Sequence, residues 1–112
     1  MGKKKNKDKV GAKTAFSVIE KNKGKCENPK CWRTGNQLHH IFFKSQYFAK
    51  DRNTGFNLAN LCYQCHDLVH HTGKKEGAIL NWYLKNKAYQ KYNGIKKAEL
   101  GLCVIRAHYK TK

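Results

Sequence analysis

Two pairs of cysteines constrain the fold of this 112-residue chain more than any other feature. Cys26 and Cys31 are separated by four residues, Cys62 and Cys65 by two, and 30 residues lie between the two pairs. Two such pairs are typical of a tetrahedral zinc site with four thiolate ligands. The sequence therefore predicts a structural zinc ion that joins two distant segments, and the alternative is four buried thiols that bind no metal. Cys103 has no such pair, and we expect it to be a small core residue.

The length of the chain limits how much core it can bury. A chain of 112 residues forms one domain at most. Residues 1–13 are rich in lysine and lack apolar periodicity, which predicts a disordered basic arm followed by a folded domain over residues 14–112. Zinc binding contributes about 10–16 kcal/mol in small peptides, more than the net stability of a typical domain, so we expect folding to depend on the metal.

The charge balance indicates a polyanionic partner. The chain has 24 Lys and Arg against 7 Asp and Glu, which gives a net charge of +17. Such a surface favours nucleic acid, and the alternatives are a solvated basic surface without a specific partner or, less favoured, an acidic membrane surface. No apolar run approaches the roughly 18 residues of a membrane span, and no signal peptide is evident. We therefore expect a protein of the reducing cytoplasm, where cysteines favour metal binding over disulfides.

The apolar pattern predicts short elements around the cysteine pairs. Helices are predicted over residues 13–24, 64–73 and 75–94. Thr14 would cap the first helix and Gly24 would end it, while the last helix has an apolar face formed by Ile79, Leu80, Tyr83 and Leu84. Strands are predicted over residues 37–43, 56–63 and 102–105, the second as a strand or turn that leads into a helix. A turn at Asn28-Pro29 and a loop over residues 44–55 complete the pattern.

Two adjacent histidines, His39 and His40, lie in the apolar stretch LHHI at residues 38–41. Neighbouring side chains of a strand point to opposite faces, so the two imidazoles cannot easily bind one metal together. We therefore expect different roles, with His39 as a metal ligand and His40 as the general base that takes a proton from water. The alternative is a pair of hydrogen-bonded core histidines.

Three further histidines follow Cys65. His66 and His70, at positions i and i+4 of the predicted helix, share one face and can bind one metal, whereas His71 falls outside that face. Together with His39 they would form a site of three imidazoles with an open position, a pattern typical of catalytic metals. The alternative is a pair of solvent-exposed histidines on a basic helix.

The run LHHIFFKS…NLANLCYQCHDLVH resembles the HNH nuclease family, and the cysteine pairs resemble those of its zinc-stapled members, common among phage and mobile-element endonucleases. The resemblance covers Cys26 to His70. It implies an α+β fold, a small ββα-metal (His-Me finger) domain with a structural four-cysteine zinc site and flanking helices. It also implies residue roles: His40 as general base, Asn57 as the family asparagine, with Asn60 less favoured, and a catalytic divalent metal bound by His39, His66 and His70.

The resemblance further implies a metal-dependent endonuclease that hydrolyses DNA phosphodiester bonds, acting in the cytoplasm of a bacterium or of a phage-infected host cell. Phosphate contacts are predicted for four basic residues that flank the site, Arg33, Lys44, Lys50 and Arg52. Because magnesium prefers oxygen ligands and this site offers nitrogen, we expect Mn²⁺, Ni²⁺, Co²⁺ or Zn²⁺ to support cleavage at least as well as Mg²⁺.

Two other functions remain open at this point. One is a non-catalytic zinc-stapled module that binds nucleic acid, and the other is a nuclease directed at RNA. Duplex DNA is the expected partner, with salt-sensitive binding and weak sequence preference. If cleavage is specific, we expect a homodimer or a phage or mobile-element protein to supply the selectivity.

Overall fold

A two-stranded antiparallel hairpin lies at the centre of the computed structural model, which describes residues 10–43, 55–71, 73–94 and 96–112. Its strands are β1 (Gln37–His40) and β2 (Leu58–Leu61), and a 3-10 helix, η2 (Gly55–Asn57), precedes β2. Among the described residues, four α-helices pack around the hairpin: α1 (Ala12–Lys21), α2 (Tyr63–Val69), α3 (Lys75–Lys91) and α4 (Lys97–Tyr109). Two strands followed by a helix, within a small α+β domain, confirm the predicted fold class.

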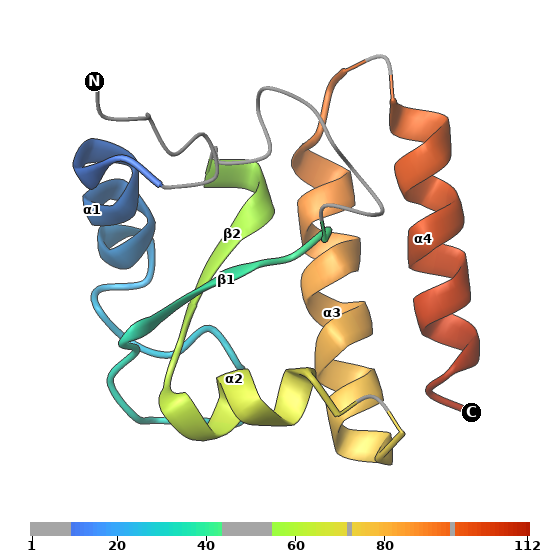
Figure 1. Cartoon of the computed structure of the whole chain (residues 1–112), viewed down its shortest axis with the longest axis horizontal. Helices are drawn as coiled ribbons and strands as arrows, with labels where there is room; N and C mark the ends of the chain where they lie inside the picture. The colour runs from blue at the N-terminus through green and yellow to red at the C-terminus, as the bar shows by residue number, and fades with distance from the viewer. Residues whose placement is uncertain (1–9, 44–54, 72, 95) are drawn as a thin grey trace, which may run out of the picture.

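The helices lie on different sides of the hairpin (Figure 1). Helix α1 packs against β2 and η2, whereas α3 and α4 run side by side across the molecule, beyond the hairpin as seen from α1. The register pairs His39 with Ala59 and His40 with Leu58, so each histidine shares a face with its cross-strand partner. The hairpin therefore separates the surroundings of the two histidines, as the alternation within a strand predicts.

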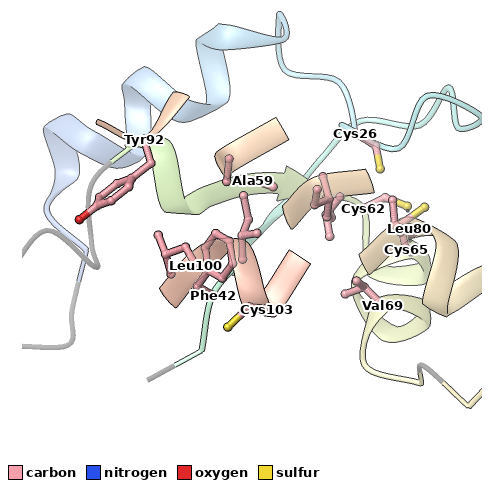
Figure 2. Packing of buried hydrophobic residues seen from close by; sticks show 14 residues of the cluster. Cys26, Phe42, Ala59, Cys62, Cys65, Val69, Leu80, Tyr92, Leu100 and Cys103 are labelled. Carbon is pink, nitrogen blue, oxygen red and sulfur yellow. Dashed lines mark hydrogen bonds between the residues drawn. The ribbon is translucent and has the colours of Figure 1, made fainter. Parts of the chain in front are cut away.

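The main core lies between the hairpin and the helices α2, α3 and α4. Phe42, Leu61, Leu84 and Leu100 are at most 1% exposed within it. Figure 2 shows Phe42, Leu100 and Cys103 close together in this core, with three of the paired cysteines at its other end. Cys103 is buried there, which confirms its prediction as a small core residue.

The strand predicted over residues 102–105 is wrong, because this segment is part of α4. Leu100, Cys103 and Ala107 are buried at helical spacing, and α4 packs along α3. Leu102 and Ile105 are 53% and 52% exposed. The apolar residues of this segment suggested a strand, but packing against a neighbouring helix decides the structure.

Helix α1 begins two residues before the predicted cap Thr14, with Gly11 as its N-cap. Ala12 and Lys13, assigned above to the basic arm, therefore lie in its first turn. Gly24 does end this segment, since it has a φ of 78° and its N–H donates to the Ile19 carbonyl (2.9 Å). The part of the arm at residues 1–9 lies outside the described residues.

The other predicted elements match the structure more closely. Helix α2 ends at Val69, before the predicted end at Gly73, and α3 ends at Lys91, close to Asn93-Gly94. The turn after Cys26 is present, since the Cys31 N–H donates to the Asn28 carbonyl (2.9 Å). Within the described ranges, no helix combines the length and the apolar character that crossing a membrane requires.

A buried lysine connects α3 to the end of β1. Lys85 is 2% exposed, and its Nζ donates a hydrogen bond to the Ile41 carbonyl. The ammonium also lies over the rings of Phe42 and Phe43, 5.1 and 4.8 Å from their centroids. Desolvation lowers the pKa of Lys85 from 10.5 to about 8, although the neighbouring Cys103 acts in the opposite direction.

The lowered pKa of Lys85 should make stability depend on pH. Between pH 8 and 10.5 the unfolded chain holds this proton more tightly than the folded protein, so the free energy of unfolding should rise with pH. The rise in the free energy of unfolding that is due to Lys85 should be about 3 kcal/mol. Lys85→Met, which keeps the length of the side chain, should abolish it in denaturant titrations at a series of pH values. Lys110→Met, at an exposed lysine, serves as control, and an unchanged pH slope in Lys85→Met would contradict the prediction.

Candidate active site and metal centres

Four cysteine sulfurs converge where the chain enters and leaves the hairpin. Cys26 follows α1, Cys31 closes the adjacent turn, Cys62 is the N-cap of α2, and Cys65 lies in the first turn of α2. Their sulfurs all lie within 4.8 Å of one another, and Cys31 Sγ lies 3.8 Å from Cys62 Sγ. A tetrahedral site with zinc–sulfur bonds of about 2.3 Å requires sulfurs about 3.8 Å apart. The cluster therefore fits a structural zinc ion, as the spacing of the cysteines predicts.

Nitrogen donors surround these sulfurs and favour their thiolate forms. The N–H groups of Arg33 and Cys65 donate to Cys31 and Cys62, both at 3.4 Å, and the side chain of Asn28 donates to Cys65 Sγ at 3.3 Å. Desolvation raises the pKa of Cys31, but the Arg33 N–H and hydrogen bonds with the other three cysteines outweigh it and lower the pKa to about 7, whereas burial raises the pKa of Cys26 and of Cys65. A thiol that ionises near neutral pH is a good metal ligand.

Three histidine side chains form a second cluster between β1 and α2. One ring nitrogen each of His39, His66 and His70 lies within 4.8 Å of the others, and the two Nε2 atoms of His66 and His70 are 3.3 Å apart. His70 is the C-cap of α2 rather than part of its last turn, yet it still faces His66. His71 is outside the cluster, with its Nδ1 2.7 Å from the Asp67 carbonyl oxygen.

The surroundings of His39 favour a metal ligand over a structural histidine. His39 is 2% exposed, and its Nε2 has no hydrogen-bond partner among the described residues. A buried polar atom without a partner costs free energy unless a ligand satisfies it. Burial, together with repulsion from His66 and Lys85, lowers the pKa of His39 to about 3. The neutral imidazole that results is the form that binds metals, so the three histidines fit a divalent cation.

An aromatic side chain closes one side of the histidine cluster. The ring of Phe43 stacks on that of His70, with centroids 5.8 Å apart and planes 8° from parallel, and its centroid lies 6.0 Å from that of His39, with the two planes perpendicular. This contact limits how the imidazoles can rotate. The sequence motifs gave no indication of a role for Phe43.

His40 is outside the cluster and belongs to the other face of β1. It is half-buried and pairs with Leu58 in the hairpin. The segment that follows it is held by Asn57, whose side-chain oxygen accepts from the Phe42 N–H (2.6 Å) while its amide donates to the Phe42 carbonyl (3.1 Å). The Asn57 carbonyl also accepts from the Ile41 N–H (2.8 Å). These contacts suit a residue that orients the backbone after His40.

Asn60, the less favoured candidate, lies elsewhere. It is 1% exposed, its backbone N–H donates to Glu27 (2.9 Å), and its side chain lies against Gly35. An added Cβ at Gly35 would meet the Asn60 amide at 2.5 Å, so the position of Asn60 requires a glycine there. Asn60 therefore supports the packing beside the first cysteine pair.

The basic residues predicted to contact phosphate divide into two groups. Lys44, Lys50 and Arg52 lie outside the described residues. Arg33 lies beside the four-cysteine cluster, with its Nη1 3.8 Å from Cys31 Sγ and its guanidinium 4.9 Å from the centroid of the Trp32 ring. Its described contacts are therefore to the cysteine cluster.

Sequence reasoning did not identify Lys85 as part of the site. A signal was present in the helical pattern, because Lys85 occupies the same stripe of α3 as three other buried residues, Ala78, Asn81 and Ala88. A lysine within a buried stripe indicates a specific partner for its ammonium.

Removal of one clustered cysteine should remove the zinc and the folded state. Cys65→Ala leaves three thiolates, whereas Cys103→Ala removes a buried thiol outside the cluster and serves as the matched control. We expect about one zinc ion per chain in the control, and loss of both zinc and the cooperative thermal transition in Cys65→Ala. Elemental analysis and thermal unfolding would measure both effects. Equal zinc content in the two variants would contradict the assignment.

Comparison with known proteins gives a family for the central part of the chain. Residues 24–72 match the family model described as HNH endonuclease, and this range includes both cysteine pairs and the three clustered histidines. Helices α1, α3 and α4 lie outside the match. No curated protein and no solved structure matches the chain. The chain therefore contains an HNH endonuclease domain at residues 24–72.

Proposed function

We propose that the protein is a metal-dependent endonuclease that hydrolyses phosphodiester bonds in DNA, with His40 as the general base. The observation that carries the proposal is the division of β1 into two faces. The buried Nε2 of His39 lacks a partner among the described residues and belongs to a cluster of three imidazoles, while His40 belongs to the other face. One strand thus offers a metal ligand and, one residue later, a separate imidazole for proton transfer.

The histidine cluster would hold the catalytic cation through His39, His66 and His70. When bound, a divalent cation supplies positive charge that stabilises the scissile phosphate and the leaving 3′ oxygen in the transition state. The HNH domain and the net charge of +17 support nucleic acid as the substrate.

The chain's own groups then act on the attacking water. The neutral imidazole of His40 takes a proton from the water as it attacks phosphorus, and imidazole is well suited to this step near neutral pH. Ile41, the next residue, is held at both of its polar groups: its N–H donates to Asn57 and its carbonyl accepts from Lys85. Asn57 and Lys85 are thus positioning residues, since an error of about 1 Å in a catalytic group can cost a hundredfold in rate.

Substitution of His40 should remove cleavage and leave folding intact. We expect His40→Ala to lower the rate of plasmid cleavage by roughly 10²–10⁴-fold, the usual contribution of a general base. Zinc content, thermal stability and DNA affinity should stay unchanged, because His40 belongs to neither metal cluster. His71→Ala, at an exposed histidine outside the clusters, is the control and should cleave at the wild-type rate.

The same measurement tests the alternative of a non-catalytic binding module. A wild-type protein that binds DNA but cleaves neither duplex DNA, single-stranded DNA nor RNA with any divalent metal would support that alternative and refute the proposal. Cleavage restricted to RNA would retain the mechanism and overturn the assignment of DNA as substrate.

The donor atoms of the histidine cluster should determine the metal preference. Nitrogen ligands favour Mn²⁺, Co²⁺, Ni²⁺ and Zn²⁺ over Mg²⁺, so these ions should support at least as much cleavage as Mg²⁺. A second measurement needs no activity: calorimetric titration of Ni²⁺ into zinc-loaded protein should show one additional site. His39→Ala should lose that site, and His71→Ala should keep it. Cleavage supported by Mg²⁺ alone would count against the three imidazoles acting together.

A further inference from the structure

We propose that Lys21, Lys87 and Lys91, here called the lysine notch, form a binding site for a backbone phosphate of DNA next to the general base. This inference rests on the proposed function, because it places the DNA strand relative to His40. The three lysines belong to α1 and α3, which lie outside the matched HNH residues. The helices that flank the domain would therefore supply part of its substrate-binding surface.

The lysine notch is a small surface hollow where α1, α3 and the end of β1 meet. Its lining includes the three lysines together with Glu27 and Ile41, and apolar side chains of η2 and α3 complete it. Lys21 ends α1, and Lys87 and Lys91 lie four residues apart on one face of α3. Two separate elements thus bring three lysines to the lining of one hollow.

The notch lies at the His40 end of the hairpin. Ile41 directly follows His40 in the chain. Lys21 Nζ lies 3.5 Å from the Leu58 carbonyl oxygen, and Leu58 is the cross-strand partner of His40. A phosphate at the notch would therefore belong to the strand near the bond that His40 acts on, rather than to a distant part of the duplex.

The charge of the notch is unbalanced in a way that favours an anion. Glu27 is the carboxylate that lines it, 3.9 Å from Lys21 Nζ, and its other oxygen accepts from the Asn60 N–H (2.9 Å). Burial is the main cause that lowers the pKa of Lys21; attraction to Glu27 opposes it, and repulsion from Lys91 and Lys87 adds to the lowering. Like charges held together raise the free energy of the unbound protein, and a phosphate between them would lower it.

The lysines also differ in how freely they can move. Lys91 is exposed, and Lys87 is half-buried with its Nζ 5.1 Å from the centroid of the Tyr83 ring. Lys21 has a side chain 35% exposed and is already held by Glu27 and the Leu58 carbonyl. Lys87 and Lys91 are therefore the residues whose substitution tests binding without disturbing the packing of α1.

The test is a binding experiment in which cleavage cannot interfere. Zinc-loaded His40→Ala protein is incubated with a short DNA duplex without added divalent metal, and its lysines are acetylated and quantified by mass spectrometry. We expect the duplex to protect Lys87 and Lys91 several-fold more than Lys110 and Lys112, two lysines at the end of α4, on the far side of α3 from α1 (Figure 1). Inorganic phosphate at the same phosphate concentration should give no protection.

A matched pair of double variants provides the second measurement. Lys87→Gln with Lys91→Gln should lower the slope of log affinity against log salt concentration by about 0.9, the contribution of one lost phosphate contact. Lys110→Gln with Lys112→Gln removes the same charge and should change the slope much less. Equal protection of the two lysine pairs, equal slope changes, or protection by inorganic phosphate alone would each overturn the inference. If the wild-type protein never cleaves but shows the expected protection, the proposed nuclease activity is refuted, whereas phosphate binding at the lysine notch is supported.

Discussion

The convergence of four cysteine sulfurs is the contact on which the rest of the molecule depends. The described sheet has two strands of four residues each, and a hairpin of this size is marginally stable alone. A zinc ion at the four sulfurs would join the segment after α1 to the first turn of α2 and so hold the two strands together at one end of the hairpin. Because His66 directly follows Cys65, the same ion would also fix where the histidine cluster begins. Folding and the geometry of the histidine cluster would therefore both depend on the four cysteine ligands.

A second constraint acts at the other end of the hairpin, where β1 leaves the sheet. Asn57 and Lys85 hold the polar groups of Ile41 and Phe42 from two elements, η2 and α3. Burying the Lys85 ammonium costs free energy, as its lowered pKa indicates. A stable core alone does not require this charge, since an apolar side chain of similar length would fill the same space. The arrangement is understandable if the backbone after His40 must hold one conformation for proton transfer.

The sequence predicted those parts of the molecule in which a residue type at a given spacing has a single chemical role. The cysteine pairs, the adjacent histidines and the strand–strand–helix order are of this kind, because metal ligands and strand alternation obey local rules. Helix α4 was missed because Val104 and Ile105 suit a strand, and only packing against α3 reveals the buried stripe of Leu100, Cys103 and Ala107. Lys85 was missed for a similar reason, since its partner Ile41 is 44 residues away in the chain. Local sequence patterns do not predict such long-range packing.

Lysines are prominent among the charged groups near the proposed site, and this would have a consequence for catalysis. Three neutral imidazoles would leave the full charge of a divalent cation available to a phosphate, whereas carboxylate ligands would offset part of it. Lys85 and the lysine notch add further positive charge nearby. The lysines would attract the cleaved strand as well as the intact one, so they would strengthen binding without distinguishing the transition state. In the proposed mechanism, rate acceleration would therefore come from the groups whose action depends on position: the bound cation, His40 and the backbone contacts that hold the segment after His40.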